Sequence, residues 1–340
     1  MKGQLSSLVQ TSYNVASVRV TETKLKKSCP RLEEIAEFRW PQYLINKKAE
    51  LVTAEKFFSL GHWSLFKALV ARDLEQRYRG TFLGLGWFLF YPLLMLAMYV
   101  FVFQIVFSLR WSDPVNNPAS MLPLPERFYF AFNLFAGMSV ASAFLEVVGR
   151  APRLVSDQPQ FVKRVVFPLP LLAIVLSVSA WLQSLVQWFI LLAVLMVSLI
   201  YVLPFTQLFE PELIKWLFIQ VPLSLVIITL VLPILFAIST VLAAIGTYVK
   251  DLSQISPALS SGLMFLGPVF YPLSSVPESF RWAMFLNPIT VVVDTLRSVV
   301  LQGFLPSLPT LVIYTITGTG AAIFGYWLFI RVKPGFADVV

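Results

Sequence analysis

Residues 69–109 join a charged segment directly to a long apolar run, and this junction limits what the chain can fold into. In the first part, and just before it, apolar side chains recur every four residues, a spacing that places them on one face of a helix. The residues with this spacing are Phe66, Val70, Leu74 and Tyr78, with Leu65 and Leu69 beside them. Residues 61–80 are therefore predicted to form an amphipathic helix in the membrane surface, with its cations toward lipid phosphates.

The apolar run that follows, residues 82–109, is long enough to cross a bilayer, because a crossing takes about 20 apolar residues. Gly80 and Gly84 loosen the corner between the two segments. An interfacial helix is thus expected to lead straight into the first membrane span.

The composition of the whole chain is typical of an integral membrane protein. Of its 340 residues, 57% are hydrophobic and 13% are charged, whereas soluble domains carry about 25% charged residues. The net charge of +8 is assigned to cytosolic loops rather than to a nucleic-acid surface, because the cations flank apolar spans. Cys29 is the only cysteine, which excludes an intrachain disulfide and a thiolate metal cluster. The N-terminus lacks the hydrophobic core of a signal peptide and is expected to stay in the cytosol.

Hydropathy and turn-forming residues predict an all-α membrane protein with six spans and both termini in the cytosol. The expected segments are a polar arm (1–60), a transmembrane domain (81–333) with spans at about 82–109, 128–148, 167–203, 216–248, 256–272 and 308–330, and a cytosolic tail (334–340). Pro222 and Pro233 are expected to kink the fourth span. The cation-rich loop 149–167 is expected inside, and the loop 110–127, rich in Pro and Asn, outside.

Residues 276–303 are largely apolar, but Asn287-Pro288 interrupts them and leaves two pieces too short to cross. Broken helices persist at membrane depth where protein or water covers their free backbone groups. We therefore predict a re-entrant helix pair on the outer side, between spans five and six. Asp294 and Arg297, three residues apart, are expected to form a local ion pair.

Several short motifs occur in order along these predicted segments. They are Arg72-Asp73-Leu74, Arg77-Tyr78, Leu83-Gly84, Trp87, Pro92, Tyr248-Val-Lys-Asp-Leu252, Pro268-Val-Phe-Tyr-Pro272, Leu286-Asn287-Pro288 and Pro334-Gly-Phe-Ala-Asp338. In this order the chain resembles the permease subunit of ABC-2-type polysaccharide exporters, which move O-antigen, capsule or teichoic-acid chains out of bacterial cells. The resemblance implies an inner-membrane channel of two copies, with lipid-linked polysaccharide and membrane lipids as its other partners. It also implies a separate ATPase subunit that binds ATP and Mg²⁺, so that this chain holds no cofactor itself.

The resemblance also assigns candidate site residues. Contacts to the ATPase are expected at Arg150, Arg153, Asp157, Lys163, Arg164, Lys250 and Asp251. An outer gate is expected at Phe270, Tyr271, Pro272, Asn287 and Pro288. On the interfacial helix, Arg72, Arg77, Tyr78 and Arg79 are expected to meet the substrate headgroup and form an interfacial gate. The three arginines are candidates for receiving a lipid pyrophosphate, since Arg offers forked donors for phosphate oxygens. Ordinary anchoring to lipid headgroups explains the same arginines equally well.

Aromatic and amide side chains inside the spans are candidates for lining a conduit for sugars. Tyr91 and Tyr99 lie in the first span, and Gln183 and Gln187 lie four residues apart on one face of the third. For the two glutamines, hydrogen bonds between helices are as good an explanation as a role in binding substrate.

The chain lacks the residues that most enzymes need. It has no G-x-x-x-x-G-K-[ST] phosphate loop, and His62 is its only histidine, so neither ATP hydrolysis nor a His-based metal or triad site is expected. Ionisable residues within the spans are too few for proton-driven transport, so the energy must come from another subunit. Two alternatives remain: an ABC-2 exporter of drugs or lipids, and a membrane-embedded transferase acting on lipid-linked sugar. A neighbouring gene for a Walker-motif ATPase would argue against the transferase.

Overall fold

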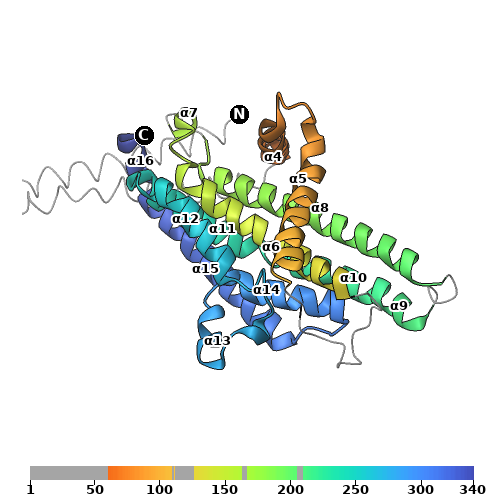
Figure 1. Cartoon of the computed structure of the whole chain (residues 1–340). Coiled ribbons are helices and arrows are strands. Elements are labelled where there is room, and N and C mark those ends of the chain that lie inside the picture. The colour runs from red at the N-terminus through yellow and green to blue at the C-terminus, as the bar shows by residue number, and fades with distance from the viewer. Residues whose placement is uncertain (1–59, 109–110, 112–125, 163–166, 205–209) are drawn as a thin grey trace, which may run out of the picture. The chain divides into compact units, whose positions relative to one another are not determined.

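The computed structural model describes residues 60–108, 111, 126–162, 167–204 and 210–340 (Figure 1). All regular structure in these residues is helical, which confirms the all-α prediction. The chain separates into two units, Met1–Trp63 and Ser64–Val340, and nearly all of the described residues belong to the second. Nearly all of the polar arm, most of the predicted outer loop 110–127, and both Lys163 and Arg164 lie outside the described residues.

Helix α4 (Leu60–Tyr78) occupies the region predicted to be interfacial. It ends before a corner at which Gly80 and Gly84 have φ angles of +82° and +50°, a left-handed backbone that costs glycine little. The turn η2 (Gly84–Gly86) then leads into α5 (Trp87–Tyr99), which continues as the π-helical η3 (Val100–Val106). Together they give a first span of 20 residues, Trp87–Val106.

Four further segments are long and apolar enough to cross a membrane, which makes the chain a multi-pass membrane protein. The helices concerned are α6 (Glu126–Arg150), α8 (Pro170–Val202), the run of α9 (Pro211–Lys215), η6 (Trp216–Gln220), α10 (Val221–Thr229) and α11 (Leu232–Tyr248), and α15 (Leu308–Val332). Helix α8 has 33 residues and is therefore roughly 50 Å long, at about 1.5 Å per residue. Pro222 lies where the π-helical η6 changes to α10, and Pro233 lies in the first turn of α11, after the turn that ends α10.

The region of the predicted fifth span is shorter than expected. Helix α12 (Leu252–Leu266) has 15 residues, or roughly 22 Å at about 1.5 Å per residue. It begins before residue 256 and stops at Gly267, because the residue before a proline disfavours the helical conformation. Residues 268–272 therefore continue as non-helical chain, followed by the short turn η7 (Leu273–Ser275).

The predicted break at Asn287-Pro288 is present. Helix α13 (Glu278–Met284) meets α14 (Pro288–Arg297) and its π-helical extension η8 (Ser298–Gln302) at an angle of 105°. The Asn287 side chain accepts a hydrogen bond from the Ile289 backbone N–H at 3.0 Å and so caps α14. Its amide nitrogen also donates to the Leu263 carbonyl at 2.9 Å, which ties the bend to α12.

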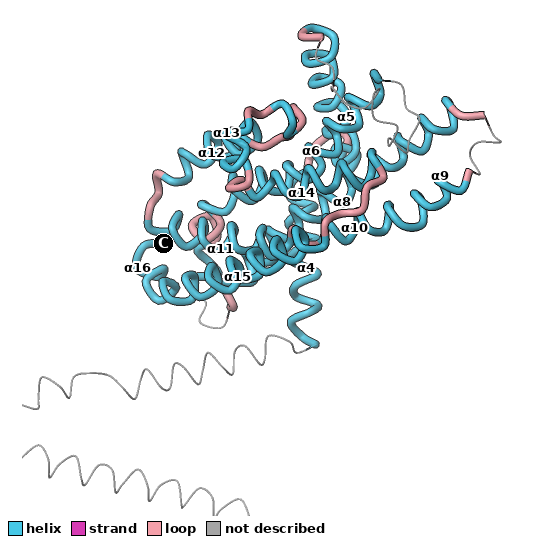
Figure 2. Tube along the Cα trace, turned by 90° about the horizontal axis from the view of Figure 1, so that it is seen from below, coloured by secondary structure: helices cyan, strands magenta, loops and turns pink. Residues whose placement is uncertain are grey.

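Helix α6 is the most buried of the five candidate spans, with 72% of its apolar window covered. It packs against α8, α12 and α14, while α11 and α15 lie side by side (Figure 2). Gly318 and Gly325 of α15 contact α11, whereas nothing lies close to Gly320 of the same helix. The chain ends with η9 (Lys333–Gly335) and α16 (Phe336–Val339), whose buried Phe336 ring lies 5.3 Å from that of Phe329.

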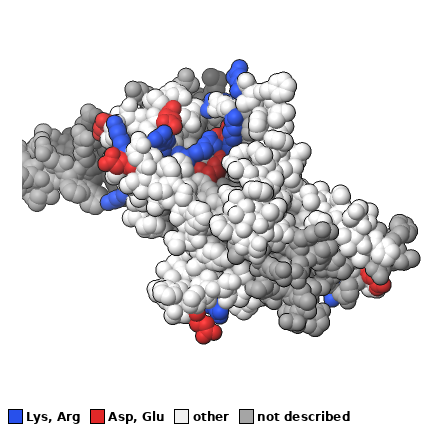
Figure 3. Space-filling model, viewed as in Figure 1, with Lys and Arg blue, Asp and Glu red and all other residues white. Residues whose placement is uncertain are grey.

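Charged side chains gather at opposite ends of the unit (Figure 3). One group surrounds α4, α16 and α7 (Pro159–Val162), and we call this end of the molecule the α7 end. The other groups lie at α13 and near α9, and the surface between them is free of charge in this view. An uncharged belt between two charged ends is the pattern of a protein that spans a bilayer.

Candidate functional site

At the α7 end, four charged side chains and one amide from three helices form a single hydrogen-bonded group, here the charge cluster. Its members are Asp73 and Arg77 from α4, Glu146 and Arg150 from α6, and Gln183 from α8. Arg77 pairs with Asp73 at 2.8 Å, and it donates to Glu146 Oε2 at 2.8 Å and to Gln183 Oε1 at 2.7 Å. One guanidinium thus holds three helices together.

Arg150 closes the charge cluster from the other side. It donates to Glu146 Oε1 at 2.8 Å and pairs with Asp73 Oδ1 at 2.5 Å. The side chains of Asp73, Arg77 and Glu146 are only 16%, 16% and 12% exposed, while Arg150 is 41% exposed. Burying such groups is tolerable only when they are paired, and here two acids balance two bases.

The pairing changes the proton affinity of Asp73. Burial by itself raises the pKa of Asp73, but the hydrogen bonds and positive charges of Arg150 and Arg77 outweigh it. They hold the pKa of this carboxyl below its ordinary value of 3.8. Asp73 therefore stays ionised, as the cluster requires.

The expectation that α4 turns its cations toward lipid phosphates is wrong for Arg77, whose side chain points into the protein. The face of α4 that packs against the protein carries Leu69 and Val70, followed by Asp73 and Arg77 at helical spacing. Hydrophobic spacing alone counts charged positions as exposed, so it cannot anticipate charges that are buried in pairs. Arg72 and Arg79 do remain exposed, and the Arg72 guanidinium lies 5.7 Å from the centre of the Phe161 ring. The side chain of Tyr78 lies outside the described set.

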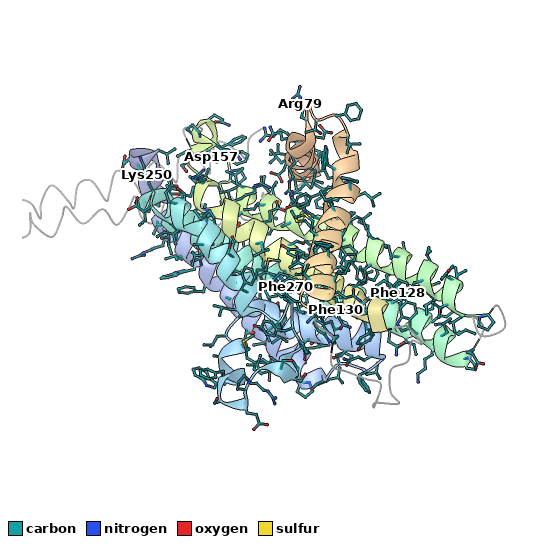
Figure 4. The ribbon with its side chains drawn as sticks, in the orientation of Figure 1. Arg79, Phe128, Phe130, Asp157, Lys250 and Phe270 are labelled. Carbon is teal, nitrogen blue, oxygen red and sulfur yellow. The ribbon has the colours of Figure 1, made fainter. Side chains whose placement is uncertain are left out.

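The residues expected to contact the ATPase lie on the surface of the α7 end. Arg153, Asp157, Lys250 and Asp251 are all exposed, and Figure 4 places Asp157 and Lys250 at the same end as Arg79. Arg150, by contrast, belongs to the charge cluster.

The chain that follows α6 contacts α11 at Gly246, which lies four residues before Lys250. In the turn η4 (Ala151–Arg153) the Pro152 backbone lies so close to Gly246 that a Cβ atom at residue 246 would overlap it. The two segments predicted to meet the ATPase are thus in direct contact with each other.

The predicted gate residue Phe270 is buried in a group of aromatic rings away from the α7 end (Figure 4). Its ring centre lies 5.2 Å from that of Tyr99, 5.0 Å from Phe103 and 5.3 Å from Phe265. Tyr99, expected to line the conduit, therefore packs edge-on against the expected gate. Tyr91 is exposed.

The remaining candidates divide between helix packing and the bend. Gln187 is buried and accepts a hydrogen bond from Ser142 of α6 at 3.1 Å, so both glutamines of α8 bond to other helices. Tyr271 donates to the Phe265 carbonyl at 3.1 Å, and Pro272 is half-buried beside it. Asn287 and Pro288 form the cap and first turn of α14.

Arg297 has partners that its sequence neighbourhood does not suggest. The expected ion pair with Asp294 does not form, and Asp294 is exposed. Instead, Arg297 Nε donates to the Asn133 carbonyl at 2.8 Å and Nη2 to the Val269 carbonyl at 2.6 Å, while Nη1 donates to the Pro268 carbonyl. The guanidinium also lies 4.6 Å from the centre of the Trp111 ring. Backbone acceptors carry no signature in a sequence, so the pattern of side chains could not have indicated this site.

Within the described residues, no group of three or more His, Cys, Asp or Glu side chains has the arrangement of a metal site. The arrangement instead offers buried ion pairs at one end and an aromatic plug at the other. Both lie within a multi-pass helical membrane protein, and this is the class that the fold defines.

Comparison with known proteins assigns the chain to a family within this class. Residues 64–301 match the family model described as ABC-2 type transporter, and the chain belongs to that family. It is 30% identical over 244 residues to the O-antigen export system permease protein RfbA of Myxococcus xanthus, covering 71% of this chain and 82% of the relative. Two RfbA permease proteins of Klebsiella pneumoniae are 24% and 25% identical over 293 and 290 residues, each match covering 83% of this chain and 98% of the relative.

Proposed function

We propose that this chain is the membrane subunit of an exporter that moves a lipid-linked polysaccharide across the bacterial cytoplasmic membrane. The observation that carries the proposal is its match to O-antigen export permeases over nearly their whole length, 98% in two cases. The order of short motifs along the chain supports the same substrate class.

A separate ATPase supplies the energy in this proposal and binds ATP and Mg²⁺. It contacts the α7 end through loop 149–167 and through Lys250-Asp251, so that this end and both termini face the cytosol. The exposed Arg153, Asp157, Lys250 and Asp251 provide a surface of mixed charge for this contact.

The charge cluster offers a route from that contact to the first span. Arg150 lies at the start of the loop and pairs with Asp73 on α4, the helix that leads through the glycine corner and η2 into α5. A push on the loop therefore acts on α4 through charged hydrogen bonds, which are among the stronger polar contacts in proteins.

A second copy of the chain completes the conduit in this proposal. Helix α5 with η3 is the least buried of the candidate spans, with only 6% of its apolar window covered by its own chain. A second copy would cover part of this surface, and lipid the remainder.

Arg72 and Arg79 are the remaining candidates for a lipid pyrophosphate, since Arg77 is occupied by the charge cluster. Replacing Arg72 and Arg79 together by alanine separates this role from headgroup anchoring. Loss of export with normal membrane insertion supports a substrate role, and unchanged export rejects it.

The function is tested by deleting the gene and restoring it together with the ATPase of the same host. The proposal expects the lipid-linked glycan to accumulate in the cytosolic leaflet after deletion, and the ATPase to copurify with the restored permease. Unchanged surface polysaccharide with retention of a drug or simple lipid would favour the other exporter class. Transfer activity of the purified chain without any ATPase would favour the transferase.

A further inference from the structure

Arg297, at the end of α14, is the charged residue that lies deepest among the described residues: it is 4% exposed. None of the ion pairs between described residues includes it. Its guanidinium donates to the three carbonyl oxygens of Asn133, Pro268 and Val269 and lies over the ring of Trp111. Such a charge is costly to bury, so these partners must be held in place for the folded state to be stable.

The three carbonyls belong to different parts of the fold. Asn133 lies on α6, the most buried span, whereas Pro268 and Val269 follow the end of α12. The guanidinium presents its donors in a planar, rigid fork, so it can satisfy all three carbonyls only in one relative arrangement of the segments. Arg297 thus fixes where residues 268–272 lie against α6 and α14.

Gly137 of α6 leaves the space that the guanidinium fills. A Cβ atom at this position would come within 3.2 Å of the Arg297 Cζ atom and of the Val269 carbonyl oxygen, and still closer to Nη2. A side chain at residue 137 is therefore incompatible with the observed position of Arg297.

Phe270 directly follows Val269, whose carbonyl oxygen accepts a hydrogen bond from Arg297. Once the Val269 carbonyl is fixed, the Phe270 ring is placed among Tyr99 and Phe103 of the first span and Phe265 of α12. We infer that Arg297 is a positioning residue for the outer gate: its guanidinium fastens residues 268–272 to α6 and α14, and so keeps Phe270 in the aromatic group that closes the conduit. This inference rests on the proposed export function and names the residue that controls the gate.

The test uses the full permease with its ATPase in intact cells, in a Cys29→Ser background, where introduced thiols are the only ones in the chain. Val269→Cys places a thiol on a side chain that is 0% exposed. With Arg297 present, it should resist a membrane-impermeant maleimide added outside. With Arg297→Gln, labelling should rise about tenfold, the scale expected for losing charged hydrogen bonds, and Arg297→Lys should lie between, because it keeps the charge but not the fork.

Leu286→Cys is the control, because Leu286 is 76% exposed at the bend between α13 and α14. It should label equally in all backgrounds. If it stays unlabelled from outside, the proposed orientation, and with it the proposed function, fails. If it labels normally while Val269→Cys stays protected with Arg297→Gln, the proposed function stands and the inference about Arg297 is overturned.

Gly137→Ala tests the same contact from the other side and serves if Arg297→Gln does not accumulate. With Arg297 present, Gly137→Ala should increase the labelling of Val269→Cys, because the added methyl group displaces the guanidinium. With Arg297→Lys it should add little further labelling, because no guanidinium remains to be displaced. Coupled effects of this kind separate a specific contact from general destabilisation. Independent, multiplying effects of the two substitutions would overturn the inference.

Discussion

Glu146 shows how much a single carboxylate can hold together. It accepts hydrogen bonds from Arg77 of α4 and Arg150 of its own helix while it is 12% exposed. Glu146→Gln should lower the free energy of unfolding by about 2 kcal/mol, because it leaves two partly buried cations with one carboxylate fewer. Thermal unfolding of the purified permease in detergent measures this.

Glu278→Gln is the matched control. Glu278 is 89% exposed and lies 3.7 Å from Arg281, so its loss should change stability by no more than about 0.5 kcal/mol. Equal losses in the two variants would contradict a special role for Glu146.

Asp73 gives the charge cluster a predictable dependence on pH. Its pKa is lowered in the folded protein, mainly because charged hydrogen bonds from Arg150 and Arg77 outweigh the opposing effect of burial. Its contribution to stability is therefore fully present above about pH 4, where the unfolded chain is also ionised, and is lost as the pH falls through the lower folded pKa. The unfolding temperature of the wild type should fall more steeply below about pH 4 than that of Asp73→Asn. Parallel curves would contradict the assignment.

At this scale the sequence indicated which residues matter better than it indicated where they point. The Arg72–Arg79 region stood out by its charges, and the glutamines of α8 by their spacing. The inward turn of Arg77 and the backbone partners of Arg297 could not be inferred, because they depend on groups far along the chain: 69 residues away for Glu146, and 28, 29 and 164 residues away for Val269, Pro268 and Asn133.

At the scale of the helices, the contact between α15 and α11 depends on glycine. A Cβ atom at Gly325 would overlap Thr240 and come within 3.0 Å of the Ala237 carbonyl oxygen, whereas nothing lies within 4 Å of such an atom at Gly320. Gly325→Ala should therefore destabilise the protein by about 1–3 kcal/mol through overpacking. Gly320→Ala, five residues away on the same helix, should stabilise it by up to about 1 kcal/mol through helix propensity.

The two alanine variants are compared by the same thermal unfolding measurement. A result in which Gly320→Ala is the more damaging of the two would show that α15 packs with a different face.

Long apolar runs made most helices predictable, because a chain in lipid has few ways to satisfy its backbone other than a helix. Pro222 and Pro233 lie where η6 changes to α10 and where a short turn precedes α11, and Asn287-Pro288 located the bend. The fifth span was overestimated, since hydropathy continues through residues 267–272 although Gly267-Pro268 ends the helix. Apolar character measures affinity for lipid and does not report where the backbone leaves the helix.

At the scale of the molecule, the proposed function places the α7 end in the cytosol and the charged end at α13 outside the cell. Two exposed serines provide a matched pair of reporters: Ser156 at the α7 end and Ser275 next to α13. In intact cells that express the permease with Cys29→Ser, Ser275→Cys should react with an impermeant maleimide. Ser156→Cys should react only after the membrane is permeabilised. The reverse pattern would invert the topology and remove loop 149–167 from the ATPase.

The Arg297 contact has a consequence for how related permeases diverge. Its acceptors are main-chain oxygens, so exchanges of side chains at positions 133, 268 and 269 that keep the backbone in place leave all of the hydrogen bonds of Arg297 intact. Paired substitutions, which usually report residues in contact, should therefore be missing between position 297 and these three. Instead, related permeases that keep an arginine at position 297 should also keep glycine at position 137, because any side chain there would overlap the guanidinium.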